Sequence, residues 1–122
     1  MKVFDPQIYP RKLFVIERPE ELSFFHGRGG EKEELELDLT VRGRVWPCVD
    51  KTTKDLGIAV YFKEIWFDTI AHESTHIANI IFGDLNVAMN WDDDEHYSYL
   101  VGWIANCIAE AHDLKIIKKK KK

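Results

Sequence analysis

The spacing of apolar residues changes once along this chain, near Lys63, and the change limits the folds that are open to it. Upstream, Leu35–Val41 alternates between apolar and acidic or polar residues, and Ile58–Phe62 is a short apolar run. These two patterns are typical of a half-buried and a buried strand. Downstream, the apolar residues recur with the period of a helix: Trp66, Ile70, Ile77 and Ile81. The chain is therefore expected to place strands first and helices second.

The order of these patterns predicts an α+β fold. Three segments are expected to form a small antiparallel sheet of about three to four strands with short links: Leu13–Ile16, Leu35–Val41 (running on through Trp46 until Pro47) and Ile58–Phe62. Two packed helices follow. The first is expected to stop near Gly83, and the second to begin at the acidic run 92–95 and reach toward Lys118.

Length and composition indicate one small domain over residues 1–122. The chain has 122 residues and a hydrophobic fraction of 45%, enough for a core without disulfides. Cys48 and Cys107 form no C-x-x-C pair, so we expect reduced, buried thiols. Pro6 and Pro10 interrupt the region where a signal peptide would need an apolar run. A cytoplasmic protein is the expectation.

The charge distribution argues against two classes of partner. The formal net charge is −4, and because five positive charges form the terminal run Lys118–Lys122, the remainder carries −9. A nucleic-acid binder usually presents a basic face, which this body lacks. The longest apolar runs are too short to span a membrane. We therefore expect no nucleic-acid partner and no membrane partner, and a solvated, flexible lysine tail at 118–122.

The segment His72-Glu73-Ser74-Thr75-His76 carries the clearest chemical signal in the chain. Residues four apart lie on one face of a helix, so His72 and His76 can direct ring nitrogens at one zinc ion. Glu73 is rotated by roughly 100° from His72. In that place it would act as general base on a zinc-activated water rather than as a ligand.

A less specific explanation of the motif is a pair of partly exposed histidines with a solvated Glu73. A match to H-E-x-x-H arises by chance in roughly 2% of sequences with this length and composition. The motif, however, lies inside a predicted helix, at the border between its apolar arc and its polar side. Such a border can face a cleft, which favours the metal site.

A catalytic zinc needs a third protein ligand, and Glu95 is the candidate. It opens the second predicted helix, with 18 residues between it and His76. A helix hairpin would return it to the first helix, and its stripe of mostly small residues would permit close packing: Glu95, Tyr99, Gly102, Asn106 and Ala109. Alternatively, Asp92 and Glu95 form a capping box. Asp92 or Asp94 would be the substitute ligand.

These motifs resemble the gluzincins, the thermolysin-like zinc peptidases with H-E-x-x-H and a later glutamate. They are most similar to small single-domain zinc peptidases of phages and prophages. The resemblance lies in Ile70–His76 and Glu95–Trp103, with Tyr9–Arg11 and Gly57–Phe62 as further matches, and covers nearly the whole chain. It implies a minimal zincin-like fold.

The resemblance implies one Zn²⁺ per chain, held by His72, His76 and Glu95, with Glu73 as the base. The larger gluzincins often carry an acid four residues after the third ligand, where this chain has Tyr99. The oxyanion stabiliser is left open among Tyr99, Tyr97, Tyr61 and His26. Asp68, one turn before His72, could orient that histidine as an outer-sphere acid or be solvated.

The predicted function is hydrolysis of peptide bonds by a zinc metallopeptidase, with a peptide or protein as partner. An extended substrate is expected to add to a sheet edge at Ile58–Phe62. The alternatives are a zinc-binding phage or prophage accessory or protein-interaction module without turnover, and an accessory protein without metal. The sequence predicts no oligomeric state.

Overall fold

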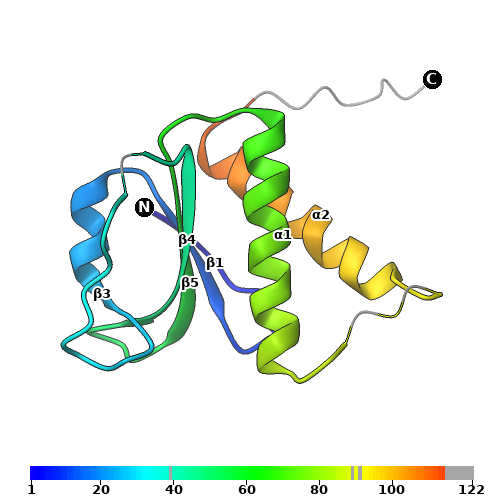
Figure 1. The fold of residues 1–122 in the computed structure, drawn as a ribbon, viewed down its shortest axis with the longest axis horizontal. Coiled ribbons are helices and arrows are strands. Elements are labelled where there is room, and N and C mark those ends of the chain that lie inside the picture. The colour runs from blue at the N-terminus through cyan, green and yellow to red at the C-terminus, as the bar shows by residue number, and fades with distance from the viewer. Residues whose placement is uncertain (39, 89, 91, 115–122) are drawn as a thin grey trace.

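The computed structural model describes residues 1–114 except residues 39, 89 and 91. Strands come first and two long helices last (Figure 1). In chain order the elements are β1 (Lys2–Phe4), β2 (Lys12–Ile16), a 3₁₀ helix (Pro19–Phe24), β3 (Phe25–His26), β4 (Gly43–Asp50), β5 (Leu56–Phe62), α1 (Phe67–Asp84) and α2 (Glu95–Ala111). The α+β prediction is thus confirmed, while the lysine tail 118–122 lies outside the described residues.

The sheet is mixed, which corrects the predicted antiparallel sheet of three to four strands. Its five strands lie in the order β1-β2-β5-β4-β3. β2 pairs with β5 in parallel, with Leu13 opposite Ile58, and the other neighbours are antiparallel. Alternation along one segment identifies a strand but not its partner, so the parallel pair and the short β1 escaped the sequence reading.

Each strand sends alternate side chains to two cores, one on either face of the sheet. Leu13 and Val15 of β2 face the helices, and Phe14 and Ile16 face the opposite side. The helix-side core contains Ile58, Val60, Phe62, Ile70, Ile77, Ile81, Leu100, Ile104 and Ile108. The opposite core contains Leu22, Phe25, Trp46, Cys48 and Ala59. Both faces of the sheet are therefore covered.

The alternating segment Leu35–Val41 does not form the predicted strand. No strand is assigned within 35–38 or 40–42. The residue just before this segment, Glu34, forms an isolated bridge with His26. The strand instead begins at Gly43 and runs through Pro47. β4 pairs with β5 along its length, but among the described residues β3 covers its other side only at Val49 and Asp50. Proline, which lacks an N–H, is compatible with this uncovered edge.

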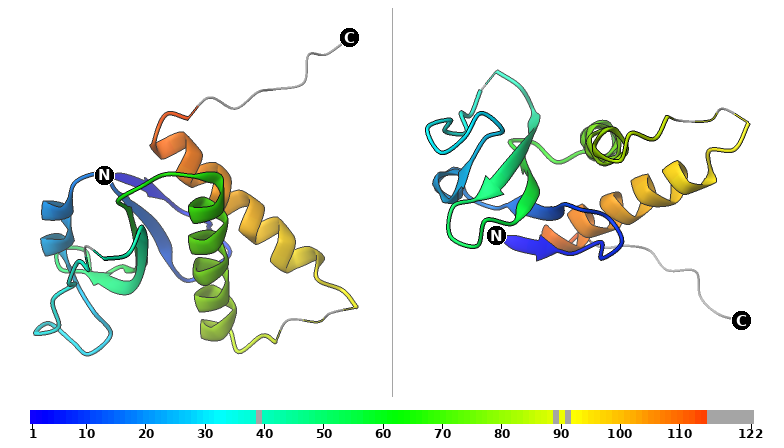
Figure 2. Two further views of the ribbon diagram at one scale, coloured as in Figure 1. Left: turned by 45° about the horizontal axis from the view of Figure 1, so that its top comes forward. Right: turned by 90° about the horizontal axis from the view of Figure 1, so that it is seen from below.

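The two helices pack on the same face of the sheet (Figures 1 and 2). In all three views the first turn of α2 lies farthest from the sheet. The Tyr97 hydroxyl nevertheless donates to Asn79 Oδ1 of α1 at 2.8 Å, and the rings of Tyr97 and Phe82 lie 5.4 Å apart. These contacts fasten the start of α2 to the second half of α1. No helix within the described ranges is long and apolar enough to cross a membrane.

The stripe of small residues on α2 does not face α1, contrary to the expectation. Glu95, Tyr99, Gly102 and Asn106 are exposed, and Ala109 is half-buried. The buried side of α2 consists of Leu100, Ile104, Cys107, Ile108 and Ala111. Burial of these larger apolar side chains removes more apolar surface from water and decides the rotation of the helix.

Candidate metal centre

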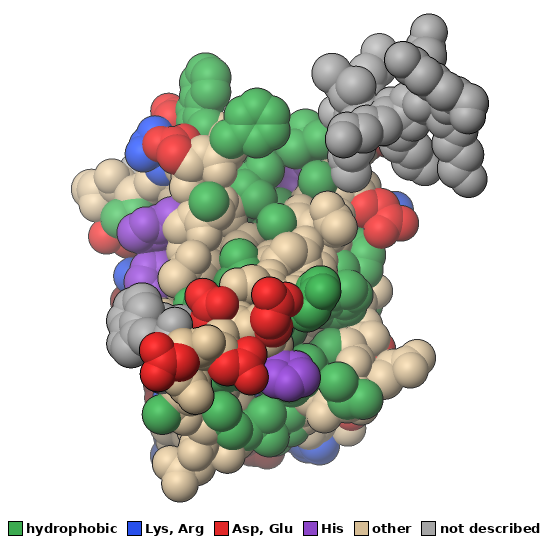
Figure 3. Space-filling model, turned by 90° about the vertical axis from the view of Figure 1, so that its right-hand side faces the viewer, with side chains coloured by type: hydrophobic (Ala, Val, Ile, Leu, Met, Phe, Trp, Pro, Cys, Tyr) green, Lys and Arg blue, Asp and Glu red, His purple; other side chains and the backbone are tan. Residues whose placement is uncertain are grey.

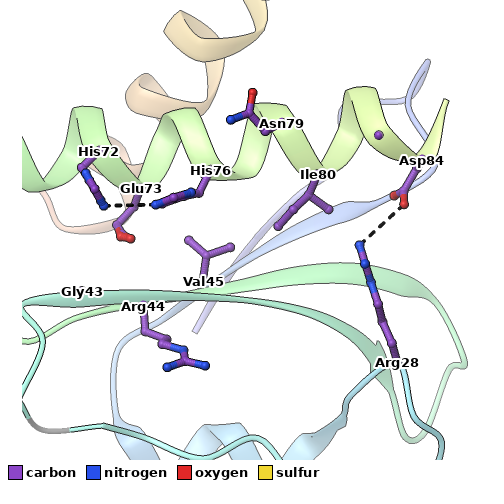
Figure 4. A pocket seen from close by; sticks show the side chains of 11 residues that line it. Arg28, Gly43, Arg44, Val45, His72, Glu73, His76, Asn79, Ile80 and Asp84 are labelled. Atoms are coloured by element: carbon purple, nitrogen blue, oxygen red, sulfur yellow. Dashed lines mark hydrogen bonds and ion pairs between the residues drawn. The ribbon is translucent and has the colours of Figure 1, made fainter. Parts of the chain in front are cut away.

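Helix α1 turns the H-E-x-x-H segment toward β4. Ile70, Ile77 and Ile81 are buried in the helix-side core and fix the rotation of the helix about its axis. Glu73 then lies on the buried side, while His72 and His76 lie beside it and are exposed. Figure 4 shows all three side chains pointing from α1 toward the start of β4. The border position predicted for the histidines is confirmed.

The two histidines are arranged as a chelating pair. Their Nε2 atoms lie 3.1 Å apart, and the rings meet edge to face with centroids 4.6 Å apart. Two nitrogens that bind one zinc tetrahedrally at about 2.0–2.1 Å lie about 3.3–3.4 Å from each other. The distance between the histidines therefore fits a shared cation with little movement.

Glu73 completes a group of three metal-binding side chains. One of its carboxylate oxygens and the two histidine nitrogens all lie within 4.8 Å of one another. Its side chain is only 5% exposed, yet none of the described residues donates a hydrogen bond to the carboxylate or forms an ion pair with it. The carboxylate oxygens are not fully buried, because Glu73 lines the cleft, so a cation or water in the cleft can reach them. The group thus has the composition and spacing of a metal site, and its chemistry leaves the identity of the metal open.

The group lines a cleft of about 760 Å³ between α1 and β4 (Figure 4). Its other lining residues are Arg28, Gly43, Arg44, Val45, Asn79, Ile80, Gly83 and Asp84. At one end Arg28 approaches Asp84, with Nη2 and Oδ1 3.8 Å apart. A second hollow of about 450 Å³ continues past His72 toward Asp68 and Arg42. The three side chains therefore stand along an open groove.

Two of the predicted supporting residues lie away from the metal group or have other partners. The Asp68 carboxylate is 3.1 Å from Arg42 Nη2 and is 66% exposed, and its hydrogen bonds do not include His72. Tyr99 is 74% exposed and lines a separate apolar hollow with Ile8 and Trp103. Neither the orienting role of Asp68 nor an oxyanion role of Tyr99 is tested, and both stay predictions.

Glu95 does not belong to the group of three in the part of the chain that the structure describes. It is the first residue of α2 and is exposed, next to the exposed Asp92–Asp94. Acidic side chains gather in the middle of the face that Figure 3 shows. The alternative capping box is not formed either, because Asp94 is the N-cap and makes no side-chain cap bond. As a third ligand of the metal-loaded protein, Glu95 stays a prediction.

The sequence reading missed the residues that form the opposite wall of the cleft. Arg28, Gly43, Arg44 and Val45 reach it from a loop and from β4. Only Gly43 carried a usable signal, since an isolated glycine in a strand-like segment often marks a close approach of something else to the backbone. The other three have no local pattern that connects them with His72.

No family model matches the chain, and comparison with characterised proteins and with solved structures found no match. The likeness to gluzincins therefore rests on the motif and on the group His72, Glu73 and His76 on α1.

Proposed function

We propose that this protein is a metal-dependent hydrolase that cleaves peptide bonds, with His72 and His76 holding a zinc ion and Glu73 acting as general base. The observation that carries the proposal is the group itself: a carboxylate oxygen of Glu73 and two imidazole nitrogens that are 3.1 Å apart all lie within 4.8 Å of one another, and the carboxylate has no partner among the described residues. Two neutral imidazoles and a carboxylate are donors that suit zinc. The resemblance of the motif to gluzincins supports the same choice.

The residues divide the chemistry among them. A zinc ion in this group supplies a Lewis acid that makes water more acidic and polarises a carbonyl. Glu73 takes a proton from a water molecule while the oxygen of that water bonds to the carbonyl carbon of the substrate. When the carbon–nitrogen bond breaks, Glu73 returns that proton to the departing amine. His72 and His76 hold the cation throughout.

The substrate is proposed to lie in the cleft as an extended segment beside β4. The edge expected earlier, Ile58–Phe62, is wrong, because β5 lies between β2 and β4 inside the sheet. The edge beside the metal group is the first half of β4, where β5 is the only strand partner within the described residues. Main-chain hydrogen bonds to such an edge suit a peptide of any sequence.

The third ligand in this proposal is Glu95, brought toward the histidines by the first turn of α2. The hydrogen bond from Tyr97 to Asn79 supports this, since it holds that turn beside the residue three positions after His76. Asp92 and Asp94 are the substitutes. Movement of the α2 start is required, because Glu95 lies outside the group.

Zinc titration of single variants tests the metal site. His72→Ala and His76→Ala should lose more than the roughly 10–100-fold in affinity that outer-sphere partners contribute. Glu95→Gln should behave like them if it is a ligand, whereas His96→Ala, next to Glu95 and also exposed, should not. The metal site is refuted if the purified protein holds less than about 0.1 zinc per chain and takes up no zinc on titration.

Glu73→Gln separates the base from a ligand. If Glu73 is the general base, Glu73→Gln should keep its zinc affinity and lose about 10²–10⁴-fold in the rate of peptide cleavage. A fall in zinc affinity comparable with that of His72→Ala would make Glu73 a ligand instead. Unchanged cleavage would exclude it as the base.

A second candidate function is a metal-binding interaction module without turnover. It is favoured by the cleft itself, whose described lining residues include none of the oxyanion candidates Tyr99, Tyr97, Tyr61 and His26. Bound zinc with no cleavage across a broad peptide library would support it. A large fall in Tm on chelation would add to that support, because a ligand of the native state alone stabilises it.

A further inference from the structure

Gly43 lies where β4 comes closest to Glu73. It is the first residue of β4 and lies on the helix-facing side with Val45, since side chains along a strand alternate and Trp46 and Cys48 belong to the opposite core. Gly43 lines both hollows that contain His72 and Glu73. Figure 4 shows it in the wall opposite the metal group.

The missing side chain of Gly43 leaves space that Glu73 fills. A Cβ atom at this position would stand 3.2 Å from Cγ and 3.5 Å from Cδ of Glu73, and 3.3 Å from Cδ1 of Phe62. Contacts of 3.2–3.3 Å are tighter than ordinary van der Waals contact, so a neighbour would have to move by a few tenths of an ångström. Glu73 has no described hydrogen bond to hold its carboxylate in place. The contact therefore falls on Cγ of Glu73, whose side chain is only 5% exposed, so its displacement costs packing.

We propose that Gly43 is a positioning residue for Glu73: its lack of a side chain sets where the carboxylate stands relative to His72 and His76. This inference rests on the proposed function. Backbone strain is not the reason for a glycine here, because the φ angle of Gly43 is outside the left-handed region. Alanine in a strand at such a φ ordinarily stabilises a protein relative to glycine. A loss of stability in Gly43→Ala would therefore indicate that the added Cβ atom presses against its neighbours.

A thermodynamic cycle tests the contact without any need for turnover. Gly43→Ala should lower Tm by about 4 °C or more, from the usual cost of overpacking in a domain of this size. In a Glu73→Ala background, which removes Cγ and the carboxylate, the loss should shrink to less than about half or become a gain. A clash with Phe62 alone would give equal losses in both backgrounds, and equal losses overturn the proposal.

The matched control is Gly102→Ala. A Cβ at Gly102, on the exposed side of α2, meets nothing within 4 Å. It should raise Tm, because alanine is the better helix former. If Gly43→Ala alone does not fold, folding of the double variant with Glu73→Ala supports the proposal. Failure of both to fold overturns it, since relief of the contact would then not restore the protein.

Kinetics and zinc titration separate positioning from general damage. Gly43→Ala should lower kcat about tenfold or more, because small displacements of a reacting group are costly, and leave KM within about twofold. Zinc affinity should stay as in the wild type, since neither His72 nor His76 is touched. Unchanged kcat, or a loss of zinc affinity like that of His72→Ala, refutes the positioning role.

The same experiment distinguishes failure of this inference from failure of the proposed function. If the wild-type protein with zinc bound cleaves no peptide, the proposed function fails, and the Tm cycle alone decides whether Gly43 sets the place of Glu73. If the wild type cleaves and the cycle shows no coupling, the proposed function stands and the role of Gly43 is wrong.

Discussion

Replacing Arg11 by methionine should destabilise the protein strongly through three acceptors that the arginine serves. Arg11 is 8% exposed, and its Nε contacts Oδ2 of Asp84 at the end of α1. Its Nη1 donates to the Gly57 carbonyl at 2.8 Å and to the Cys48 carbonyl at 3.4 Å. Arg11, directly before β2, therefore connects the start of that strand with β5, β4 and α1. Methionine keeps much of the apolar stem and removes all three interactions.

The expected loss follows from those contacts. Removing one member of a buried ion pair costs about 3–5 kcal/mol, but the Asp84 side chain is 23% exposed and water takes over part of its solvation. An unsatisfied buried carbonyl adds about 1–3 kcal/mol, and the packing of the methionine offsets some of this. We expect a decrease of about 2–4 kcal/mol in the free energy of unfolding. For this chain length that is a fall in Tm of about 8–15 °C.

Urea unfolding followed by circular dichroism measures the change, and Arg28→Met is the matched control. Arg28 meets the same carboxylate at 3.8 Å, but its side chain is 58% exposed. Such a surface pair contributes about 0–1 kcal/mol. A loss below about 1 kcal/mol for Arg11→Met, or equal losses for the two arginines, would refute the argument from burial.

Three further predictions concern other described side chains. Ser74 is fully buried, and its Oγ has no hydrogen-bond partner among the residues that the structure describes, so Ser74→Ala should raise the free energy of unfolding by about 1 kcal/mol. A loss of stability on urea unfolding would contradict this. Burial raises the pKa of the Cys48 and Cys107 thiols to about 12, from 9.0. The folded state holds the thiols in their neutral form. Their contribution to the free energy of unfolding is therefore complete below pH 9, and above pH 9 it should fall by up to about 1.4 kcal/mol per pH unit for each thiol. Unfolding at several values of pH should show the steeper fall in the wild type than in a Cys48→Ala/Cys107→Ala variant, and identical slopes would contradict it. Tyr97→Phe removes the donor to Asn79 and should cost about 0.5–1.5 kcal/mol, and no change on chemical unfolding would show that this bond does not hold α2 to α1.

Local patterns predicted the helices far better than the sheet. The spacing of Ile70, Ile77 and Ile81 locates α1, and the observed helix ends one residue after Gly83. The segment Leu35–Val41 shows the opposite case, since its alternation suits a strand but no strand is assigned to its described residues. Helical hydrogen bonds form within a segment, whereas a strand requires a partner from elsewhere in the chain. Alternation alone does not supply that partner.

The sequence by itself determined that His72 and His76 share one side of a helix and that Glu73 stands beside them, because 3.6 residues per turn fix that relation. Tertiary structure decided what they face. Packing of α1 against the sheet placed Gly43 of β4 opposite Glu73, and burial of Leu100 and Ile104 turned Glu95 and Tyr99 of α2 outward. Those placements depend on contacts between residues distant in the chain, whose energies compete across the whole core and leave no trace in the spacing of any one segment.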